Sequence, residues 1–212
     1  MNGLKWVLKS VDHFWKVFMT KWFTSDLHIG HKRICEFTDR KLVTTAEDHD
    51  NWVVDLWNSQ VKPGDIVWIL GDVSFARFDK TCEALKKMQG QKHIIKGNHD
   101  RSDALNLLKA ANIIQNWHDY KEIKVGGKED NLTACLFHFP ITAWHRQHYG
   151  SFMLHGHCHG SFQGEGKILD VGLDNSYNIF GEHKLFSEDD VLQFMQGREV
   201  YIAESHRNYK ER

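Results

Sequence analysis

Short apolar runs alternate along the chain with longer segments whose apolar residues recur at helical spacing. The apolar runs predict strands over residues 17–24, 66–70, 93–95, 132–137 and 168–172, a strand beginning at 152, and one or two strands between 113 and 125. Helical spacing predicts helices over 45–57, 78–88, 102–110 and 187–196, with Thr45 and Ser187 as N-caps. Because no linker or internal repeat is visible, we expect a single domain over 17–212. Residues 1–16 would precede it as an extension, helical or unstructured.

Side chains suited to metal binding follow several of these strands. The segment from 152 to 160 organises the chain, since its apolar run ends in His157 and His159. Asp26 and His28 follow the run 17–24 with the same spacing. Residues i and i+2 of extended backbone point to the same side, so we expect each pair to converge on one point. Imidazoles and carboxylates brought together in this way favour a divalent transition ion.

Three further segments end in polar residues of the same kind: Asp72, the run Asn98-His99-Asp100, and His138. Asp72 follows a strand that reads as buried on both faces, where a carboxylate is costly unless a positive charge meets it. Each signal is weak alone, because an Asp-x-His pair and a Gly-Asn-His-Asp run both occur in ordinary turns. Turn chemistry explains the Asn and Asp residues but not His99.

Composition narrows the class of protein. The chain has 212 residues, 41% hydrophobic and 26% charged, with a net charge of -1, so no overall field draws it to nucleic acid or membrane. Its 15 histidines are the compositional oddity. The four cysteines are scattered, which argues against a disulfide framework or a zinc knuckle. With no run of 18 apolar residues and no convincing signal peptide, we expect a cytoplasmic protein without a membrane span.

The five polar segments, in this order, resemble the calcineurin-like metallophosphoesterase superfamily, and within it the small stand-alone bacterial or phage enzymes. The motif string of that superfamily runs D-x-H, G-D, G-N-H-D, H and G-H-x-H, and each part is present between residues 17 and 175. The resemblance implies an α/β fold, a four-layer αββα sandwich with two central mixed β-sheets flanked by helices. It also implies two metal ions, one held by Asp26, His28, Asp72 and His159, the other by Asp72, Asn98, His138 and His157.

The chemistry that this resemblance implies is hydrolysis of a phosphodiester or phosphomonoester, with a nucleotide or a nucleic-acid end among the candidates. Two divalent ions would lower the pKa of a bridging water, and the resulting hydroxide would attack phosphorus. Asp72 would bridge the ions and His99 would donate a proton to the leaving oxygen or stabilise the phosphoryl charge. Asp100 would orient a neighbouring group. We expect Mn²⁺, with Fe, Zn²⁺ or Ni²⁺ as alternatives.

Four charged residues near the motifs are candidates for substrate binding: His31, Arg40, His145 and Arg146. Solvated surface charge is the competing interpretation for them. His155 precedes the last motif and is interpreted as a bystander or as a support for the ligands. We expect no obligatory protein partner.

Two other functions compete with the phosphoesterase. The first is a catalytically silent metal-binding scaffold, against which the presence of His99 argues, since a scaffold need not keep a proton donor. The second is another binuclear hydrolase such as an amidohydrolase, which typically starts from H-x-H rather than D-x-H. The absence of D-R-G after Asp72 argues against protein dephosphorylation.

Overall fold

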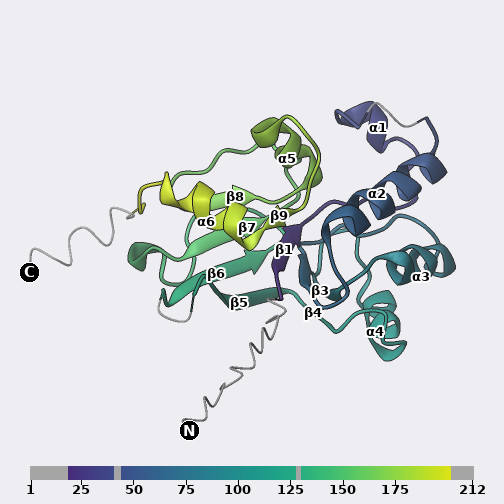
Figure 1. Ribbon diagram of the computed structural model, residues 1–212, viewed down its shortest axis with the longest axis horizontal. Helices are drawn as coiled ribbons and strands as arrows, with labels where there is room; N and C mark the ends of the chain where they lie inside the picture. Colours follow the sequence, from purple (N-terminus) through teal and green to yellow (C-terminus); the bar gives the residue numbers. More distant parts are fainter. Residues whose placement is uncertain (1–18, 41–43, 128–129, 202–212) are drawn as a thin grey trace, which may run out of the picture.

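Two β-sheets form the centre of the protein, as the computed structural model of residues 19–40, 44–127 and 130–201 shows (Figure 1). The predicted extension 1–16 lies outside the described residues. The first sheet has the order β4-β3-β2-β1-β9. Four of its strands are parallel: β1 (Lys21–Thr24), β2 (Ile66–Ile69), β3 (Gln91–Ile95) and β4 (Asn116–His118). The short β9 (Phe186–Ser187) pairs antiparallel with β1 at the edge.

The second sheet has the order β5-β6-β7-β8. Its strands are β5 (Tyr120–Val125), β6 (Leu132–Phe137), β7 (Phe152–His155) and β8 (Ile168–Asp170). The edge strand β5 pairs antiparallel with β6, whereas β6, β7 and β8 run parallel. Exposure alternates along β5, as expected for a strand with one wet face, while every residue of β7 is buried.

The two sheets pack face to face through one apolar layer. Phe23 and Leu70 from the first sheet meet Leu136 and Leu154 from the second, and all four are fully buried. Val191 and Met195 of α6 (Glu188–Gln196) pack against the same apolar layer. Both sheets therefore share one core, and their strand ends lie beside each other.

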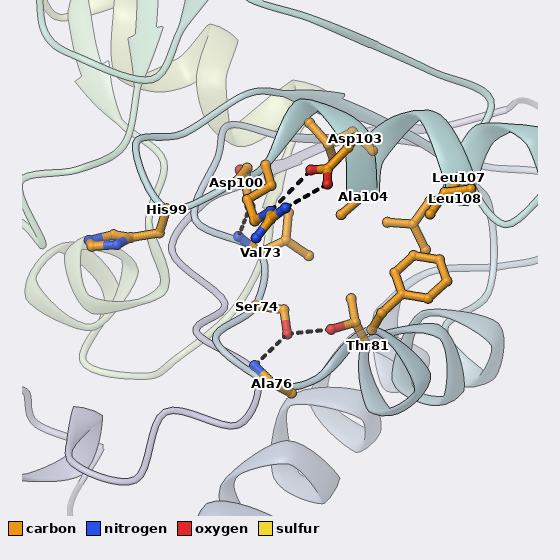
Figure 2. Close-up of a pocket in the computed structure, with 13 residues that line it drawn as sticks. Val73, Ser74, Ala76, Thr81, His99, Asp100, Asp103, Ala104, Leu107 and Leu108 are labelled. Atoms are coloured by element: carbon orange, nitrogen blue, oxygen red, sulfur yellow. Dashed lines mark hydrogen bonds and ion pairs between the residues drawn. The ribbon is translucent and has the colours of Figure 1, made fainter.

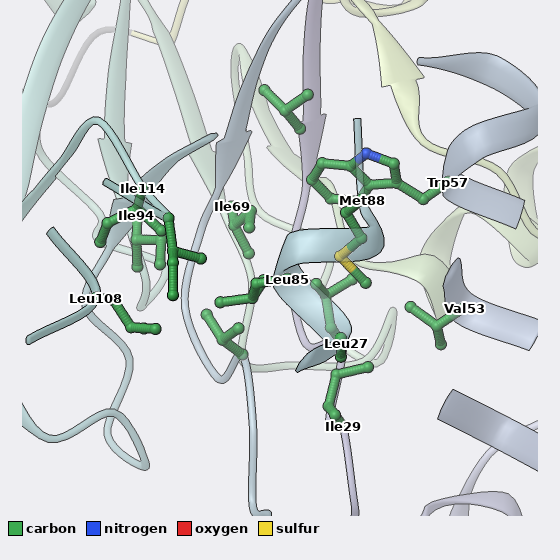
Figure 3. Packing of buried hydrophobic residues seen from close by; sticks show 14 of the residues in the cluster. Leu27, Ile29, Val53, Trp57, Ile69, Leu85, Met88, Ile94, Leu108 and Ile114 are labelled. Atoms are coloured by element: carbon green, nitrogen blue, oxygen red, sulfur yellow. The ribbon is translucent and has the colours of Figure 1, made fainter. Parts of the chain in front are cut away.

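Three helices cover the outer face of the first sheet: α2 (Ala46–Gln60), α3 (Phe78–Lys87) and α4 (Ser102–Ala110). Trp57, Leu85 and Leu108 from these helices pack against Ile69 and Ile94 of the sheet (Figure 3). The Thr45 hydroxyl caps α2 by accepting a hydrogen bond from the Asp48 amide, as the sequence predicts. Ser187 and Asp190 form a capping box at the start of α6, so that predicted cap is also confirmed.

The outer face of the second sheet is covered differently. Cys135, Met153 and Ile168 pack there under Trp144, which belongs to the connection between β6 and β7. That connection includes a short 3-10 turn, η1 (Gln147–Tyr149). The remaining helices are α1 (Ile34–Phe37) and α5 (Leu173–Phe180), which the sequence-based prediction missed. The predicted architecture, two mixed sheets flanked by helices in an α/β fold, is confirmed.

Within the described ranges, we find no helix with the length and apolarity that a membrane crossing requires.

Candidate metal centre

The candidate residues follow strands of both sheets at one end of the sandwich. Asp26 and His28 follow β1, Asp72 follows β2, and Asn98 follows β3, all in the first sheet. His138 follows β6, and the pair His157 and His159 follows β7, in the second sheet. Because the strands that carry them run parallel within each sheet, their carboxyl ends meet at the same edge. The Nδ1 atom of His138 lies 2.7 Å from the Leu70 carbonyl oxygen and so joins the sheets at that edge.

The local backbone of these pairs differs from the predicted extended conformation. Asp26 and His28 both have φ of 55°, and His157 and His159 have φ of 70° and 48°. In each pair, left-handed residues flank a single intervening residue, and the strands themselves end earlier, at Thr24 and His155. Asp26 and His28 converge on one point as predicted, whereas His159 lies with them and His157 lies with Asp72 and His138, so the predicted convergence of His157 and His159 is wrong.

The structure gathers six of the candidate residues into two groups. Asp26, His28 and His159 form the first, and Asp72, His138 and His157 form the second, with potential ligand atoms within 4.8 Å of one another in each group. In the second group, His138 Nε2 lies 3.6 Å from Asp72 Oδ1 and 2.9 Å from Asn98 Oδ1. Ligand atoms bound to one ion at about 2.1 Å are separated by roughly 3–4 Å, so both groups are close to the spacing of a metal site.

Three of these imidazoles form a hydrogen bond through Nδ1 to a group that is not one of the candidate ligands. His28 Nδ1 shares a 3.0 Å hydrogen bond with His31, His138 Nδ1 bonds the Leu70 carbonyl, and His159 Nδ1 lies 2.6 Å from Asp174 Oδ2. In metal sites, such a partner orients the ring and leaves the other nitrogen free for the ion. Nε2 is thus the nitrogen available at each of these histidines.

Two buried atoms of the first group test whether an ion fits. Of the side chains that the structure describes, Asp26 Oδ1 and His28 Nε2 are among the few buried polar atoms without a hydrogen-bond partner. They lie 3.9 Å apart and belong to residues that are otherwise well bonded. An unsatisfied buried carboxylate oxygen beside an unsatisfied imidazole nitrogen is costly, and a cation between them removes that cost. The donor set therefore fits a divalent ion.

Ionisation in the first group is compatible with metal binding. Burial opposes the charge of Asp26, but the imidazoles of His28 and His159 and the Ser25 hydroxyl outweigh it and lower the pKa of Asp26. Burial lowers the pKa of His28. Burial opposes the charge of His159, but the Asp174 hydrogen bond and the Asp26 carboxylate outweigh it and raise the pKa of His159. Metal ions bind anionic carboxylates and neutral imidazoles, so an ion bound here would displace any proton on the second nitrogen of His159.

Glycines bring the ligand segments close together. A Cβ on Gly97 would collide with the side chain and backbone nitrogen of Asp72, and a Cβ on Gly156 would collide with Ser25 and with Asp26. These two positions allow the β2 and β3 loops, and the β1 and β7 loops, to approach to van der Waals distance. The glycines of the motifs therefore have a steric role beside the ligands.

Arg40 is not a surface residue, so its predicted contact with substrate is wrong. Its side chain is fully buried, with Nε and Nη2 each donating 2.9 Å hydrogen bonds to the two Asp174 oxygens. Nη2 also donates to the Asp26 carbonyl at 2.8 Å. Arg40 thus fixes the segment that carries Asp26 and, through Asp174, the ring of His159. No role for Asp174 could be predicted from the sequence, because its partners Arg40 and His159 are distant along the chain.

His145 and Arg146 contact residues outside the two groups. His145 Nδ1 is 2.9 Å from Glu122 Oε2 on β5, and its carbonyl accepts from Ser151 and Cys135 on the outer side of the second sheet. The guanidinium of Arg146 lies 5.8 Å from the ring of Tyr149. The substrate-binding role of both residues stays a prediction. His31, by contrast, lies against His28 and remains at the centre.

His99 and Asp100 occupy different positions beside Asp72. His99 is exposed, with Nε2 4.0 Å from Asp72 Oδ2, and its backbone amide donates to Asp72 Oδ1. Asp100 is buried and accepts hydrogen bonds from the backbone amides of Gly97, Asp72 and Val73. His155 is buried too, and burial lowers its pKa to about 4. Its Nδ1 bonds the Gly156 carbonyl at 2.8 Å, so it supports the loop before His157.

A cavity of about 370 Å³ lies behind the His99 loop, between α3 and α4. Its lining includes Ser74, Thr81 and Leu108, together with His99 and Asp100, but none of the seven candidate ligands. The imidazole of His99 points away from this cavity (Figure 2). The metal centre and the cavity are therefore on different sides of the loop.

A two-sheet α/β sandwich that gathers carboxylates and imidazoles into two such groups defines a class, the metal-dependent hydrolases with paired ion sites. The chain belongs to the calcineurin-like phosphoesterase family, whose model matches residues 19–211. Members of this family bind divalent metal ions and act on phosphate esters.

Several proteins of known sequence or structure are similar to the chain. The Gene 66 proteins of Mycobacterium phages D29 and L5 are 33% and 34% identical over 200 residues, covering 82% of this chain and 94% and 93% of theirs. Both are small stand-alone proteins, as the sequence predicts for the subfamily. A protein of unknown function from Aquifex aeolicus has a solved structure that superposes with a TM-score of 0.61 at 20% identity, over 83% of this chain and 99% of its own. That likeness supports the fold.

Proposed function

We propose that the protein is a binuclear metal-dependent phosphoesterase that hydrolyses a phosphodiester or phosphomonoester. The observation that carries this proposal is the pair of buried, unsatisfied atoms Asp26 Oδ1 and His28 Nε2, which face each other inside a group of metal-ligating side chains. A matching second group lies alongside, next to an exposed imidazole that can donate a proton.

We assign the ligands of the two ions as follows. Asp26, His28 and His159 would hold one ion, His138, His157 and Asn98 the other, and Asp72 would serve both. When bound, the two ions would supply Lewis acidity, polarising the phosphoryl group and lowering the pKa of the attacking water. Mn²⁺ is our preferred ion, because this mixture of carboxylate, amide and imidazole ligands without thiolate suits it; Fe, Zn²⁺ and Ni²⁺ are alternatives.

The residues of the chain supply orientation and a proton. His99 extends from the β3–α4 loop into solvent beside Asp72, within reach of an ester oxygen on a phosphate bound there. As the P–O bond to the leaving group breaks, the proton of His99 would pass to that oxygen. Asp100 would keep the Asp72 segment and the His99 segment in register, since it bonds the amides of both loops.

The test is Mn²⁺-dependent hydrolysis of bis-p-nitrophenyl phosphate and p-nitrophenyl phosphate, compared between the wild type and His99→Ala. We expect kcat to fall about 10²–10⁴-fold in the variant, the range typical of a lost general acid. Metal content, measured by elemental analysis after gel filtration, should be unchanged. The matched control is His148→Ala, an exposed histidine of the 3-10 turn, which should keep wild-type rates.

The main competing function is a silent metal-binding scaffold. A wild type that binds two equivalents of metal but hydrolyses neither ester with Mn²⁺, Fe²⁺, Zn²⁺ or Ni²⁺ would favour the scaffold over the enzyme. Full activity of His99→Ala would keep the enzyme but remove the proposed proton donor.

We also propose that the protein works in a reducing compartment such as the cytoplasm. Its cysteines Cys35, Cys82, Cys135 and Cys158 are all free thiols in the structure.

A further inference from the structure

Two exposed phenylalanines border the two ligand groups. Phe75 lies three residues after Asp72 and is 39% exposed, and Phe139 directly follows His138 and is 37% exposed. The phenylalanines of the core, Phe23 and Phe186, are fully buried. An exposed phenyl ring beside a polar centre loses hydrophobic stabilisation, so these positions call for an explanation.

Phe75 packs on imidazoles at the first group. Its ring is stacked on those of His28 and His31, with centroids 4.8 and 4.5 Å away and interplanar angles of 27° and 17°. It also contacts the ring of His99 at 4.5 Å. Phe75 therefore adjoins both a proposed ligand and the proposed proton donor.

The row of rings continues outward from Phe75. Beyond His31, Phe37 lies 6.4 Å away and is 62% exposed, and the guanidinium of Arg33 lies 4.8 Å over its ring. Flat rings that alternate with a cation form the kind of surface on which unpaired nucleobases stack.

Phe139 occupies the corresponding position at the second group. Its ring lies 4.9 Å from that of His138 and 4.7 Å from that of His157, edge to face in both cases. Phe75 thus contacts His28 of one group, and Phe139 contacts both imidazoles of the other. A phosphate bound between the groups would have one aromatic side chain on each side.

We propose that Phe75 and Phe139 select the substrate, and that the substrate is a phosphodiester joining two nucleosides, with one base stacked on each phenyl ring. This inference rests on the proposed phosphoesterase function. Only a diester has a substituent on both sides of its phosphorus, so a monoester would leave one ring without a partner. Planar bases suit the stacked rings better than a flexible alkyl chain.

The geometry also assigns a direction. His99 contacts Phe75, so the nucleoside that receives the proton of His99 lies on the Phe75 side. Phe139 would then hold the nucleoside that keeps the phosphate.

Other exposed phenylalanines lack this combination of contacts. Phe78 lines the cavity between α3 and α4, which contains none of the candidate ligands, and Phe180 packs on Phe186 at the far end of α5. Phe162 contacts His155, which is buried. They provide matched controls for substitution.

The experiment measures kcat/KM of the Mn²⁺-loaded full-length protein for four diesters. These are thymidylyl-thymidine, its two analogues that each lack one base, and glycerophosphoethanolamine, a diester without bases. Product analysis identifies which nucleoside leaves. For the wild type, we expect removal of either base to lower kcat/KM by about 5- to 150-fold, the factor that one base–aromatic stack contributes.

The variants are Phe75→Leu and Phe139→Leu, with Phe78→Leu and Phe180→Leu as controls. For Phe75→Leu, kcat/KM should no longer depend on the base of the leaving nucleoside but should still depend on the other base. Phe139→Leu should show the reverse, and the controls should behave as the wild type. Because each comparison is a ratio between substrates of one variant, a general loss of rate or stability does not affect it.

The outcomes separate this inference from the proposed function. If the wild type hydrolyses no ester with any divalent ion, the phosphoesterase itself is wrong. If it hydrolyses glycerophosphoethanolamine as fast as thymidylyl-thymidine, or if Phe78→Leu rather than Phe75→Leu changes the ratios, the enzyme stands and the aromatic selection is overturned.

A last comparison identifies the source of the diester. Phe37→Leu is assayed on thymidylyl-thymidine and on a single-stranded oligothymidylate. If Phe37→Leu loses rate on the oligothymidylate alone, the substrate is a nucleic-acid strand long enough to reach the ring of Phe37. If the rates on both substrates are unchanged, the substrate is a dinucleotide.

Discussion

At the scale of single residues, the metal centre is built from strained backbone. Five of the seven candidate ligands have positive φ: Asp26, His28, Asp72, His157 and His159. Each non-glycine residue in that region costs of order 1–3 kcal/mol, which the surrounding structure must offset. Here the segments hold one another, since the amide of Asp26 donates to the Gly71 carbonyl and the amide of His157 donates to Asp26 Oδ2, both at 3.0 Å. Strain concentrated in this way is characteristic of a functional site.

Asp174 provides the first prediction at this scale. Burial opposes its charge, but Arg40 and the imidazole of His159 hold the pKa of Asp174 far below its usual range, so it stays anionic at neutral pH. Replacing it in Asp174→Asn weakens its hold on His159 Nδ1. We expect a 10- to 100-fold loss of Mn²⁺ affinity, typical of losing such a partner, measured by isothermal titration calorimetry.

Asp55→Asn, on the exposed face of α2, is the control and should bind Mn²⁺ as the wild type does. Because Asp174 also neutralises the buried Arg40, circular dichroism must first show that Asp174→Asn is folded. A folded variant with unchanged affinity at both sites would contradict the role given to Asp174.

At the scale of elements, Asp100 joins the loops that follow β2 and β3. Its Oδ2 accepts from the amides of Gly97 and Asp72 at 2.8 and 2.9 Å, and its Oδ1 accepts from Val73 at 3.0 Å. In Asp100→Asn, one oxygen becomes an N–H₂ group that faces a backbone N–H. We expect the free energy of unfolding, measured in urea, to fall by about 1–2 kcal/mol. This is less than a lost hydrogen bond and the new N–H repulsion would cost together. The reason is that burial disfavours the charged carboxylate and raises the pKa of Asp100, whereas the neutral amide of asparagine carries no charge to bury.

Asp103→Asn in the next helix, α4, is the matched control, since its exposed carboxylate pairs with Arg101 at the surface. It should unfold at the wild-type urea concentration. Equal stability of Asp100→Asn and the wild type would show that the two loops do not depend on this carboxylate.

The elements themselves were largely predictable, because their signals are local. Leu132–Phe137 and Ser102–Ala110 occur with the bounds that the apolar pattern predicts, and Thr45 and Ser187 cap helices as their side chains dictate. The helix α5 was missed because it begins only three residues after the end of β8, with Val171 and Gly172 between them, directly after the predicted strand 168–172. The edge strand β9 has only two residues, too few for a periodicity.

The candidate ligands could be predicted from the sequence because each one follows a strand in a recognisable motif. The residues that hold these ligands in place could not be predicted. Arg40 and Asp174 are 134 residues apart in the chain yet form a bidentate ion pair, and no local pattern distinguishes this arginine from a solvated one. The loop that carries His145 and Arg146 lies between two motifs and packs on the outer face of the second sheet through Trp144 and the His145 carbonyl. These are contacts between distant residues, which no local pattern indicates.

At the scale of the whole molecule, the two ligand groups lie across the seam between the sheets. The first group combines Asp26 and His28 from the first sheet with His159 from the second, and the other combines Asp72 from the first with His138 and His157 from the second. Each ion would therefore cross-link the two halves of the sandwich at the end where their strands terminate, and metal binding and folding would be thermodynamically linked.

Metal removal consequently has a predictable effect on stability. An ion that binds only the folded protein stabilises it by about 2.7 kcal/mol at a free concentration one hundred times its Kd. For a chain of this size that raises Tm by about 5–10 °C for each site. Differential scanning calorimetry with excess EDTA and with Mn²⁺ should show this shift, and His159→Ala, which disables the first group, should retain only part of it. His145→Ala, which removes an exposed imidazole on the outer face, should retain all of it. An identical Tm with EDTA and with saturating Mn²⁺, Zn²⁺ or Fe²⁺ would mean that the two groups do not hold ions across the seam, and the ligand assignment would have to be abandoned.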